Sequence, residues 1–524
     1  IKNGIVAITK ADLAEDEWIE LVVEEVRELI DKSLLKGASI VVVDSISGKG
    51  IEDLRSELDI LIEKAEFHVD PGFFRMPVDR SFLIKGYGRV VTGTVWSGEL
   101  GIDEKIILHP GSKQFRVRGL QAHEKMVDKV RCGDRAALNI SGEIDPERGS
   151  VLVSPGRLIE TQLVDVFLNI LPGAREVKHR MRVRLHFGTG EVIGRVVLVN
   201  TTVIKPGASG YGRLALETSV AVLHGDRGVI RFYSPVETIG GLKILDPSPP
   251  DQNRMARDLE QRLGDLNAGG QIALKTFIHS RGIILTKDLI RIIARDERSI
   301  RNDLAEMRDR REILMPDSVN ECCIDKTLWE SWKTGTLPVL RKFHKDRPEE
   351  EGMPKRSWGL DVTEGKAPAE LLEVLIEELV SANIIVYNNG LLSLADHVVQ
   401  LHHSDEKNAS RIMELLETSG INVPLPSAIG EELGLRKEEV RRILRALKQI
   451  GKVVILDERV VISAVELEKI KQSLTGNFKS GELFTIGQAG ELLHSTRKYI
   501  VPLFEYLDRQ GFSERRDDKR VILG

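Results

Sequence analysis

The sequence predicts a multidomain chain in which an α/β part, an all-β part and an α+β part follow one another. Three observations carry this prediction. Residues 1–66 alternate strand-like and helix-like apolar patterns, residues 70–247 hold short strands separated by glycines, and the rest of the chain is rich in helix and repeats one plan. The Pro-Ser-Pro-Pro run at 247–250 marks the end of the all-β part.

The composition is that of a globular protein with no unusual class signal. Of its 524 residues, 41% are hydrophobic and 30% are charged, and the formal net charge is −5. This weak negative charge excludes a global basic field, so any nucleic-acid site must be a local patch. No apolar run approaches the ~18 residues of a membrane helix, and we expect no membrane partner.

The cysteines and histidines give no sign of a disulfide framework or a metal site. The chain has three cysteines, two of them adjacent at Cys322 and Cys323, and its 12 histidines lack ligand spacing. We therefore expect no metal ligands among them and a reducing compartment, most simply the cytoplasm.

Residues 1–66 have the pattern of two β-α units from a doubly wound domain. Apolar strands are expected at 4–8 and 39–43, with amphipathic helices after each of them. Because two units are too few to form a complete domain and the chain enters its first strand almost at once, we expect an N-terminally truncated sequence.

Two loops of this segment point to a guanine site. Thr9, Lys10 and Asp12 follow the first strand. A carboxylate there can accept two N–H bonds from guanine, and a lysine stem can lie over the base. The loop at 44–51, with Ser45 and Ile46, follows the next strand at the position of a second base-contacting loop. A plain Gly-containing strand-to-helix turn is the alternative for this second loop.

The order and spacing of both loops resemble those of GTPases, which implies the C-terminal part of a P-loop GTPase domain at 1–66 and GTP or GDP with Mg²⁺ as cofactors of the complete protein. The phosphate loop and the Mg²⁺-binding switch segments are expected upstream of Ile1. We therefore expect no catalytic residue here and no GTP hydrolysis by this chain alone.

The all-β part has the strand spacing of two small closed barrels. The expected ranges are 70–155 and 156–247, joined near Val153-Ser154-Pro155-Gly156.

The helix-rich part repeats a plan of helix, turn, helix and β-hairpin, which is that of a winged-helix module. The clearest copy spans 426–462, and others are expected at 283–315, 369–394 and 484–523. The interval 316–368 reads as irregular and highly charged, so the first two modules are less well defined. The expected ranges of the four modules are 251–330, 331–400, 404–465 and 466–524.

The most specific stretch lies at the start of the first barrel. Residues 75–98, with the segments 116–121 and 133–140, are similar to the second domain of the selenocysteine-specific translation elongation factors, a family of translational GTPases. The resemblance covers essentially all 524 residues: a partial GTPase domain, two elongation-factor-type β-barrels and four tandem winged helices. Elongation factor Tu shares the barrel but lacks this helical C-terminus.

The resemblance also implies a pocket for the aminoacyl end of the tRNA. The matching positions are Asp79, Arg80 and Arg135. A selenol is mostly anionic at neutral pH, so guanidinium groups would distinguish selenocysteine from serine, with the carboxylate orienting one of them. The alternative is a structural ion pair of Asp79 with Arg80 and a solvated Arg135.

Basic residues near the C-terminus suggest a phosphate-binding surface. Arg497, Lys498 and Tyr499 open a helix, and Arg515, Arg516 and Arg520 cluster at the following hairpin. These are the parts of a winged helix best placed to contact a nucleic-acid backbone. A solvated charged face is the alternative, whereas the resemblance implies binding of a hairpin in selenoprotein mRNA. Tyr499 or His494 could stack on an unpaired base or simply pack.

These features together predict a monomeric, GTP-dependent factor that delivers selenocysteinyl-tRNA to the ribosome at UGA codons while its winged helices hold the mRNA hairpin. Two alternatives stay open: another translational GTPase of the elongation factor Tu type, and a winged-helix regulator that binds DNA. The tandem helical modules disfavour the first, and the guanine-site loops disfavour the second.

Overall fold

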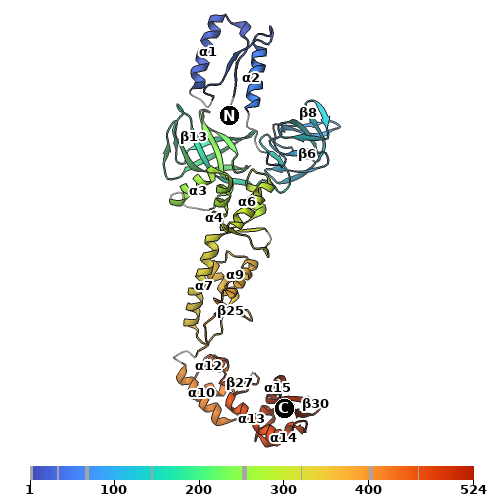
Figure 1. The fold of residues 1–524 in the computed structure, drawn as a ribbon, viewed down its shortest axis with the longest axis vertical. Helices are drawn as coiled ribbons and strands as arrows, with labels where there is room; N and C mark the ends of the chain where they lie inside the picture. The colour runs from blue at the N-terminus through green and yellow to red at the C-terminus, as the bar shows by residue number, and fades with distance from the viewer. Residues whose placement is uncertain are drawn as a thin grey trace.

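The structure is a computed structural model that describes residues 4–31, 35–64, 70–142, 145–250, 257–319, 321–400, 405–457 and 459–523. The chain forms an elongated molecule (Figure 1). An α/β part lies at one end, two β-structures lie side by side below it, and helical units form a column that leads to the C-terminus at the other end.

The N-terminal part is a two-stranded parallel sheet flanked by helices. Strands β1 (Val6–Ile8) and β2 (Ile40–Val42) pair in parallel, and α1 (Asp16–Asp31) and α2 (Ile51–Glu63) follow them. The short 3-10 helix η1 (Ala11–Leu13) occupies the first loop. Both strands lie within the ranges expected from their apolar runs.

The second part is an antiparallel β-structure built around an eight-stranded sheet. Its strand order is β3-β12-β7-β8-β11-β5-β4, with β9 paired to β8, while β6 and β10 pair separately. The first five strands are β3 (Arg75–Pro77), β4 (Arg80–Ile84), β5 (Gly88–Thr94), β6 (Glu99–Gly101) and β7 (Lys105–His109). The others are β8 (Lys113–Ala122), β9 (Lys125–Val127), β10 (Lys129–Arg131), β11 (Arg135–Ile140) and β12 (Val151–Val153). We call this structure barrel II, although its strands form a path that ends at β3 and β4 and not the closed barrel expected.

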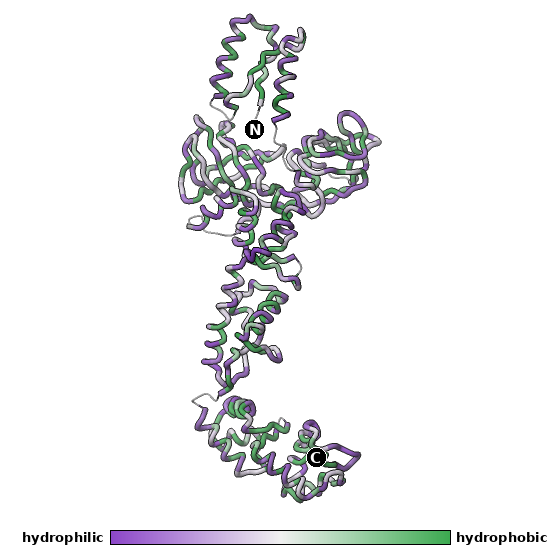
Figure 2. Tube along the Cα trace, viewed as in Figure 1, coloured by the Kyte–Doolittle hydropathy of each residue, from purple (hydrophilic) through white to green (hydrophobic). Residues whose placement is uncertain are grey.

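The third part, barrel III, is a closed barrel in the order β13-β18-β16-β15-β19-β20. Buried residues alternate with less buried ones along strands such as β16, and the buried set is apolar and fills the barrel. The tube of this part carries both hydrophobic and hydrophilic segments (Figure 2). Its strands are β13 (Glu160–Ile170), β15 (Arg182–Phe187), β16 (Gly190–Leu198), β18 (Ser209–Ala221), β19 (Arg227–Phe232) and β20 (Thr238–Asp246), with the side pair β14 (Val177–Lys178) and β17 (Val203–Ile204).

Barrels II and III touch backbone to backbone. A Cβ built on Gly149 would lie 2.6 Å from the Cα of Gly190, so only glycine permits this approach. Beside it, the Thr189 hydroxyl donates to the Val78 carbonyl at 2.7 Å. The two barrels are thus in direct contact at this point.

Beyond the barrels the chain repeats one structural unit four times. In each unit a helix of 13 residues is followed by a strand that begins 16 positions after the helix start. The helices are α6 (Glu297–Asp309), α9 (Ala369–Ser381), α12 (Lys437–Gln449) and α15 (Arg497–Arg509), and the strands are β22 (Ile313–Leu314), β25 (Ile385–Asn388), β27 (Val453–Ile455) and β30 (Ser513–Arg516). We number the units 1 to 4 in chain order.

The other elements of the four units complete a helix, turn, helix and hairpin plan. Unit 1 contains α4 (Gly270–Arg281), β21 (Ile283–Leu285), α5 (Thr286–Ile292) and β23 (Cys322–Asp325). Unit 2 contains α7 (Lys326–Asp346), β24 (Met353–Pro354), α8 (Lys355–Thr363) and β26 (Leu391–Leu394). Unit 3 contains α10 (Glu406–Ser419), α11 (Pro426–Leu433) and β28 (Val461–Ser463). Unit 4 contains α13 (Ala464–Asn477), β29 (Leu483–Thr485), α14 (Ile486–Leu492) and β31 (Lys519–Ile522).

The expectation that 316–368 is irregular is wrong. This interval contains α7, a helix of 21 residues with Pro338 inside it. Trp329, Trp332 and Leu340 on one side of α7 are buried in the core of unit 2. The helix forms because tertiary packing of this apolar stripe overrides the high charge of its exposed side.

Unit 1 docks on barrel III through an extra helix, α3 (Arg257–Ala268), and a buried charge network. Arg262 of α3 donates to Asp165 of β13 at 2.6 Å and lies 3.4 Å from Asp246 of β20. Arg213 also pairs with Asp165, and Arg281 with Asp246. Both carboxylates are buried, where an unpaired charge would be costly. Arginines from barrel III and from the helices that follow it compensate their charges.

Candidate functional site

The two predicted guanine loops lie next to each other at the carboxyl edge of the parallel pair. Val43 donates its N–H to the Ile8 carbonyl at 2.8 Å, and Ala11 donates to the Val43 carbonyl at 3.4 Å. Lys10 adopts a left-handed conformation with φ of 62°, which turns the chain into η1. The structure therefore brings the two loops together as the sequence predicts.

All five predicted base-site side chains are solvent-exposed. They are Thr9, Lys10, Asp12, Ser45 and Ile46. An exposed carboxylate on one loop and exposed backbone on the other can meet the edge and the face of a planar base.

Asp44 begins the second predicted loop, but the sequence prediction did not name it among the site residues. Its buried carboxylate accepts N–H bonds from Ile46 and Ser47, both at 2.8 Å, and so shapes the second loop. The hydrogen bond from the Ser47 side chain, followed by these two backbone bonds, lowers the pKa of Asp44. An Asp at the start of a short loop rich in Ser and Gly, as at 44–48, is the sequence signal of such an Asx turn.

The predicted aminoacyl pocket maps to the outer face of barrel II. In register, Arg80 of β4 lies opposite Thr92 of β5, and Arg135 of β11 lies opposite Thr94. Residues directly opposite each other share a face, and so do residues two apart on one strand. The two arginines therefore project from one face, on either side of β5 and roughly 10 Å apart by strand spacing.

The carboxylate of the predicted pocket is already paired. Arg135 donates to Asp79 at 2.6 Å, with side chains 61% and 23% exposed, respectively. Arg80 is exposed and forms no ion pair with any residue that the structure describes. The alternative pairing of Asp79 with Arg80 is thus wrong, because Asp79 turns across β5 to Arg135.

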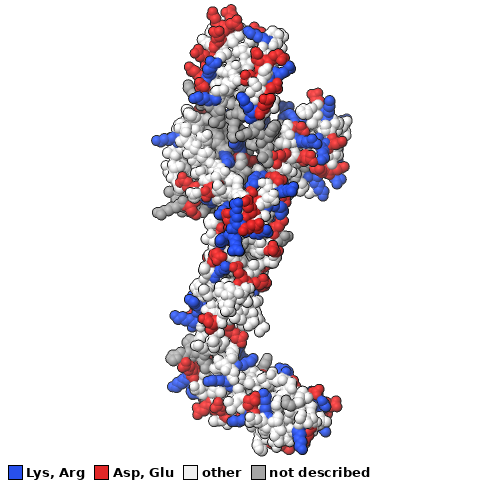
Figure 3. Space-filling model, viewed as in Figure 1, with Lys and Arg blue, Asp and Glu red and all other residues white. Residues whose placement is uncertain are grey.

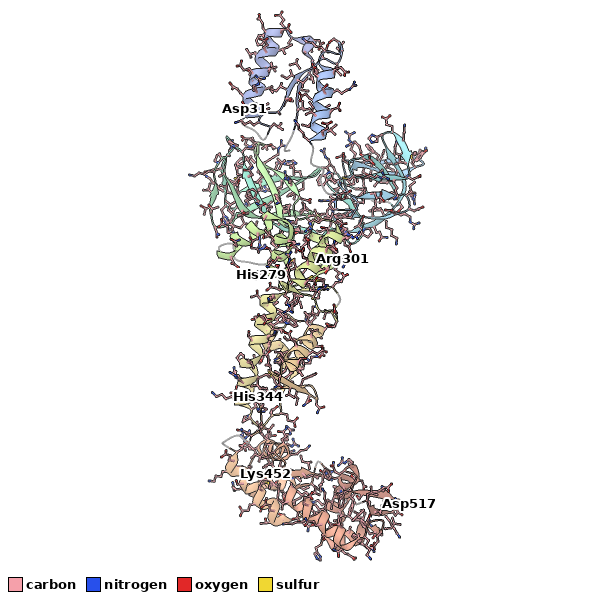
Figure 4. The ribbon with its side chains drawn as sticks, in the orientation of Figure 1. Asp31, His279, Arg301, His344, Lys452 and Asp517 are labelled. Atoms are coloured by element: carbon pink, nitrogen blue, oxygen red, sulfur yellow. The ribbon has the colours of Figure 1, made fainter. Side chains whose placement is uncertain are left out.

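The predicted RNA surface divides into exposed and buried residues. Arg497 and Lys498 are exposed at the start of α15, where Thr496 holds the N-cap position without a side-chain capping bond. Arg515 and Arg516 are exposed on the hairpin, and Arg516 pairs with Glu514 at 2.9 Å. Figure 4 labels Asp517 at the tip of this hairpin, at the outer edge of unit 4.

Two members of that set have another role. Arg520 is buried and pairs with Asp508 of α15 at 2.6 Å, which makes it a link between hairpin and helix rather than an RNA contact. Tyr499 is half-buried and packs against the apolar core of unit 4. His494 is exposed, and with Arg497, Gly487 and Gly490 it lines a groove of about 470 Å³ between α14 and α15.

Charges of both signs are interspersed over the visible face of the molecule (Figure 3), in keeping with the net charge. In the described ranges, no group of three or more His, Cys, Asp or Glu side chains could hold a metal ion. Among the same residues, no helix is both long and apolar enough to cross a membrane.

Comparison with known proteins shows which family the chain resembles. Residues 164–251 match the family model described as "Selenocysteine-specific elongation factor, beta-barrel domain", and residues 477–522 match "Elongation factor SelB, winged helix". The selenocysteine-specific elongation factor of Desulfomicrobium baculatum is 29% identical over 100% of this chain and 83% of its own length. The chain is therefore similar to the selenocysteine-specific elongation factors along its whole length.

Two further relatives agree over the whole chain. The selenocysteine-specific elongation factor of Escherichia coli is 24% identical over 99% of this chain and 81% of its own length. The crystal structure of a bacterial selenocysteine-specific elongation factor, EF-Sec, matches with a TM-score of 0.62 over 100% of this chain and 82% of that chain, at 23% identity. This last likeness concerns the fold. The resemblance inferred from the sequence is thereby confirmed, and a DNA-binding regulator is disfavoured.

Proposed function

We propose that this chain delivers selenocysteinyl-tRNA to the ribosome at UGA codons, as part of a GTP-dependent elongation factor that an mRNA hairpin tethers. The single observation that carries the proposal is the pair of arginines on one exposed face of barrel II, in a chain that resembles this family. A second charged surface lies on unit 4, at the far end of the molecule (Figure 1). One end can therefore hold the message while the other carries the tRNA, which raises the local concentration of the tRNA at one codon.

The barrel II face suits an anionic aminoacyl side chain. Arg80 has no carboxylate partner among the described residues, so its charge is available to a ligand. Arg135 is held by Asp79, but its guanidinium has further N–H donors and its side chain is largely exposed. A selenolate between them would be stabilised by charge, whereas the neutral hydroxyl of a seryl group would not.

The test of this pocket is the ratio of affinities for selenocysteinyl-tRNA and seryl-tRNA. We expect Arg80→Ala to lower the ratio at least about tenfold, since a charge-assisted hydrogen bond contributes roughly 1.5–3 kcal/mol. Arg118→Ala, which removes an exposed arginine of β8 outside the predicted pocket, is the matched control. An unchanged ratio in Arg80→Ala would refute the pocket while leaving the family resemblance untouched.

The nucleotide requirement follows from the loops at 9–12 and 44–51. The exposed Asp12 and Lys10 would suit guanine, and the loop at 44–51 lies beside their loop. The sequence contains no Gly-x-x-x-x-Gly-Lys-Ser/Thr motif to hold phosphates and Mg²⁺. We therefore expect the 524 residues alone to show no GTP hydrolysis above a buffer control, and a rate that Asp12→Asn abolishes would contradict this expectation.

The four C-terminal units are proposed to be winged helices, and unit 4 is proposed to bind the hairpin. Exposed cations at the start of α15 and on the β30–β31 hairpin would contact phosphates, and the groove beside His494 would take an unstacked base. Removing both cations with Arg515→Ala and Arg516→Ala is expected to weaken hairpin binding and to reduce the salt slope by about 0.7 for each lost phosphate contact.

The binding experiment uses the full chain, a selenoprotein mRNA hairpin, a scrambled hairpin and duplex DNA at two salt concentrations. Arg298→Ala with Arg308→Ala, two exposed cations of α6, is the matched control. Selective hairpin binding supports the proposal. A preference for duplex DNA would instead favour the DNA-binding alternative.

The same samples test the expected monomer by light scattering against the chain mass of 58.5 kDa. Action in the cytoplasm, where translation takes place, is part of the proposal.

A further inference from the structure

The 13-residue helices of the four units differ sharply in charge although they occupy the same place in the fold. Helix α6 carries three basic and four acidic residues, and α9 carries four glutamates without a basic residue. Helix α15 carries three basic and two acidic residues, whereas α12 carries five basic and two acidic residues. The most positive of these helices is therefore in unit 3, outside the surface already proposed to bind the hairpin.

The cations of α12 lie on one face. Lys437, Arg441, Arg445 and Lys448 follow one another at spacings of four, four and three residues. At roughly 100° per residue they fall within an arc of about 80°, and they extend over about 17 Å of helix axis. The opposite side of the helix is the core side, with Val440, Ile443 and Leu447 among its buried residues.

These four cations are unpaired, in contrast to two cations of α6 in unit 1. All four are exposed, and none forms an ion pair with any residue that the structure describes. The fifth cation of the helix, Arg442, is held by the buried Asp405 at 2.8 Å. On α6, Arg301 is neutralised by Glu297 and Glu321, and Arg308 by Asp309.

The surface lacks the features of a protein-binding face. No large apolar side chain is exposed between 437 and 448, which the structure describes in full, so a desolvated core of an interface is missing. An evenly spaced row of unpaired cations on the second helix of a helix-turn-helix instead matches the phosphates of a nucleic acid. Lys452, labelled in Figure 4, is a further exposed cation of unit 3. It lies directly before β27, the first strand of the hairpin that follows α12.

We infer that Lys437, Arg441, Arg445 and Lys448 form a second RNA-binding surface, one that contacts the phosphate backbone of an RNA helix without reading its sequence. We call it the α12 stripe. Duplex RNA hides base edges in a deep, narrow major groove, so a row of cations binds its shape and charge. The inference rests on the proposed function only for the choice of RNA as the nucleic acid. The helix can be the stem of the tethered hairpin or a separate RNA.

The test compares the full chain with a variant carrying Lys437→Ala, Arg441→Ala, Arg445→Ala and Lys448→Ala. Alanine is the best helix former, so α12 itself should be preserved. The probe is an unrelated RNA duplex of about 20 base pairs, titrated between about 50 and 200 mM salt. We expect the variant to bind at least about tenfold more weakly and its salt slope to fall by about 3, at 0.7–0.9 for each lost contact.

A matched control removes four exposed cations elsewhere on units 1 and 2: Arg298→Ala, Arg308→Ala, Arg341→Ala and Lys342→Ala. If the control loses duplex affinity as much as the stripe variant, only net charge matters and the inference is overturned. Unchanged duplex binding in the stripe variant overturns it as well.

A competition experiment separates the two RNA sources and the two proposals. If the α12 stripe binds a separate RNA, one chain binds the mRNA hairpin and the duplex together; if it binds the hairpin's own stem, excess hairpin displaces the duplex. Failure of the hairpin site would appear as loss of preference for the true over the scrambled hairpin in the unsubstituted chain. Failure of the stripe would appear only in the duplex titration of the variant.

Discussion

The buried charge network between barrel III and unit 1 allows a quantitative prediction. Arg262 places its guanidinium 2.6 Å from Asp165 and 3.4 Å from Asp246, and both carboxylates are almost fully buried. Removing one partner of a buried ion pair costs about 3–5 kcal/mol. Because Arg213 and Arg281 remain beside the two carboxylates, we place Arg262→Ala at the lower end, about 3 kcal/mol.

Hydrogen exchange measures this cost locally, which matters in a multidomain chain that does not unfold in two states. A loss of about 3 kcal/mol corresponds to amide exchange about two orders of magnitude faster in α3. Core amides of β16 should keep their rates, because the barrel retains its own apolar core. Arg262→Lys, which keeps the charge but not the planar fork, should be intermediate.

The control is Arg298→Ala, an exposed residue of α6 that should change stability by no more than about 0.5 kcal/mol. The reasoning would be refuted if α3 exchange in Arg262→Ala rose by less than about fivefold, since the network would then contribute under about 1 kcal/mol. Equal acceleration in β16 would mean that barrel III depends on the docked helix for its own stability.

Three further predictions concern packing, titration and thiol reactivity. In calorimetry, Gly149→Ala should lower the melting temperature more than Gly156→Ala. Both positions have positive φ, but only a Cβ at position 149 would meet backbone atoms, at 2.6 Å. Equal effects of the two substitutions would exclude the clash as the cause. Burial lowers the pKa of His344 to about 4, so the unfolded state takes up the proton first and stability should fall as pH drops from about 6.5 to 4. Tryptophan fluorescence should report this loss, and His344→Gln should remove up to about 3 kcal/mol of it; an unaltered pH profile would contradict the assignment. Burial raises the pKa of Cys323 to about 11, so at pH 8 iodoacetamide should modify the exposed Cys132 first, and equal rates by mass spectrometry would be inconsistent with the structure.

Local pattern made several parts of this fold predictable. The repeat of helix, turn, helix and hairpin could be predicted from the spacing of apolar residues, which in a helix recur three or four positions apart. The two guanine loops were predictable because parallel strands bring their carboxyl ends to one edge of a sheet. The structure of the interval 316–368 was not predicted, because its many charged residues obscured the apolar stripe of α7. That stripe stabilises the helix only by packing into the core of unit 2.

The sequence by itself determined the order of the parts, the family resemblance and the positions of the charged residues. Only the tertiary structure decided which of those charges are available. Arg520 and Arg515 are the same residue type on the same hairpin, yet Arg520 is buried against Asp508 and Arg515 is exposed. Asp165 and Arg262 meet although they are 97 residues apart. The physical reason is that a charge acts through its distance and solvent exposure, and both are set by how elements distant in the chain pack together.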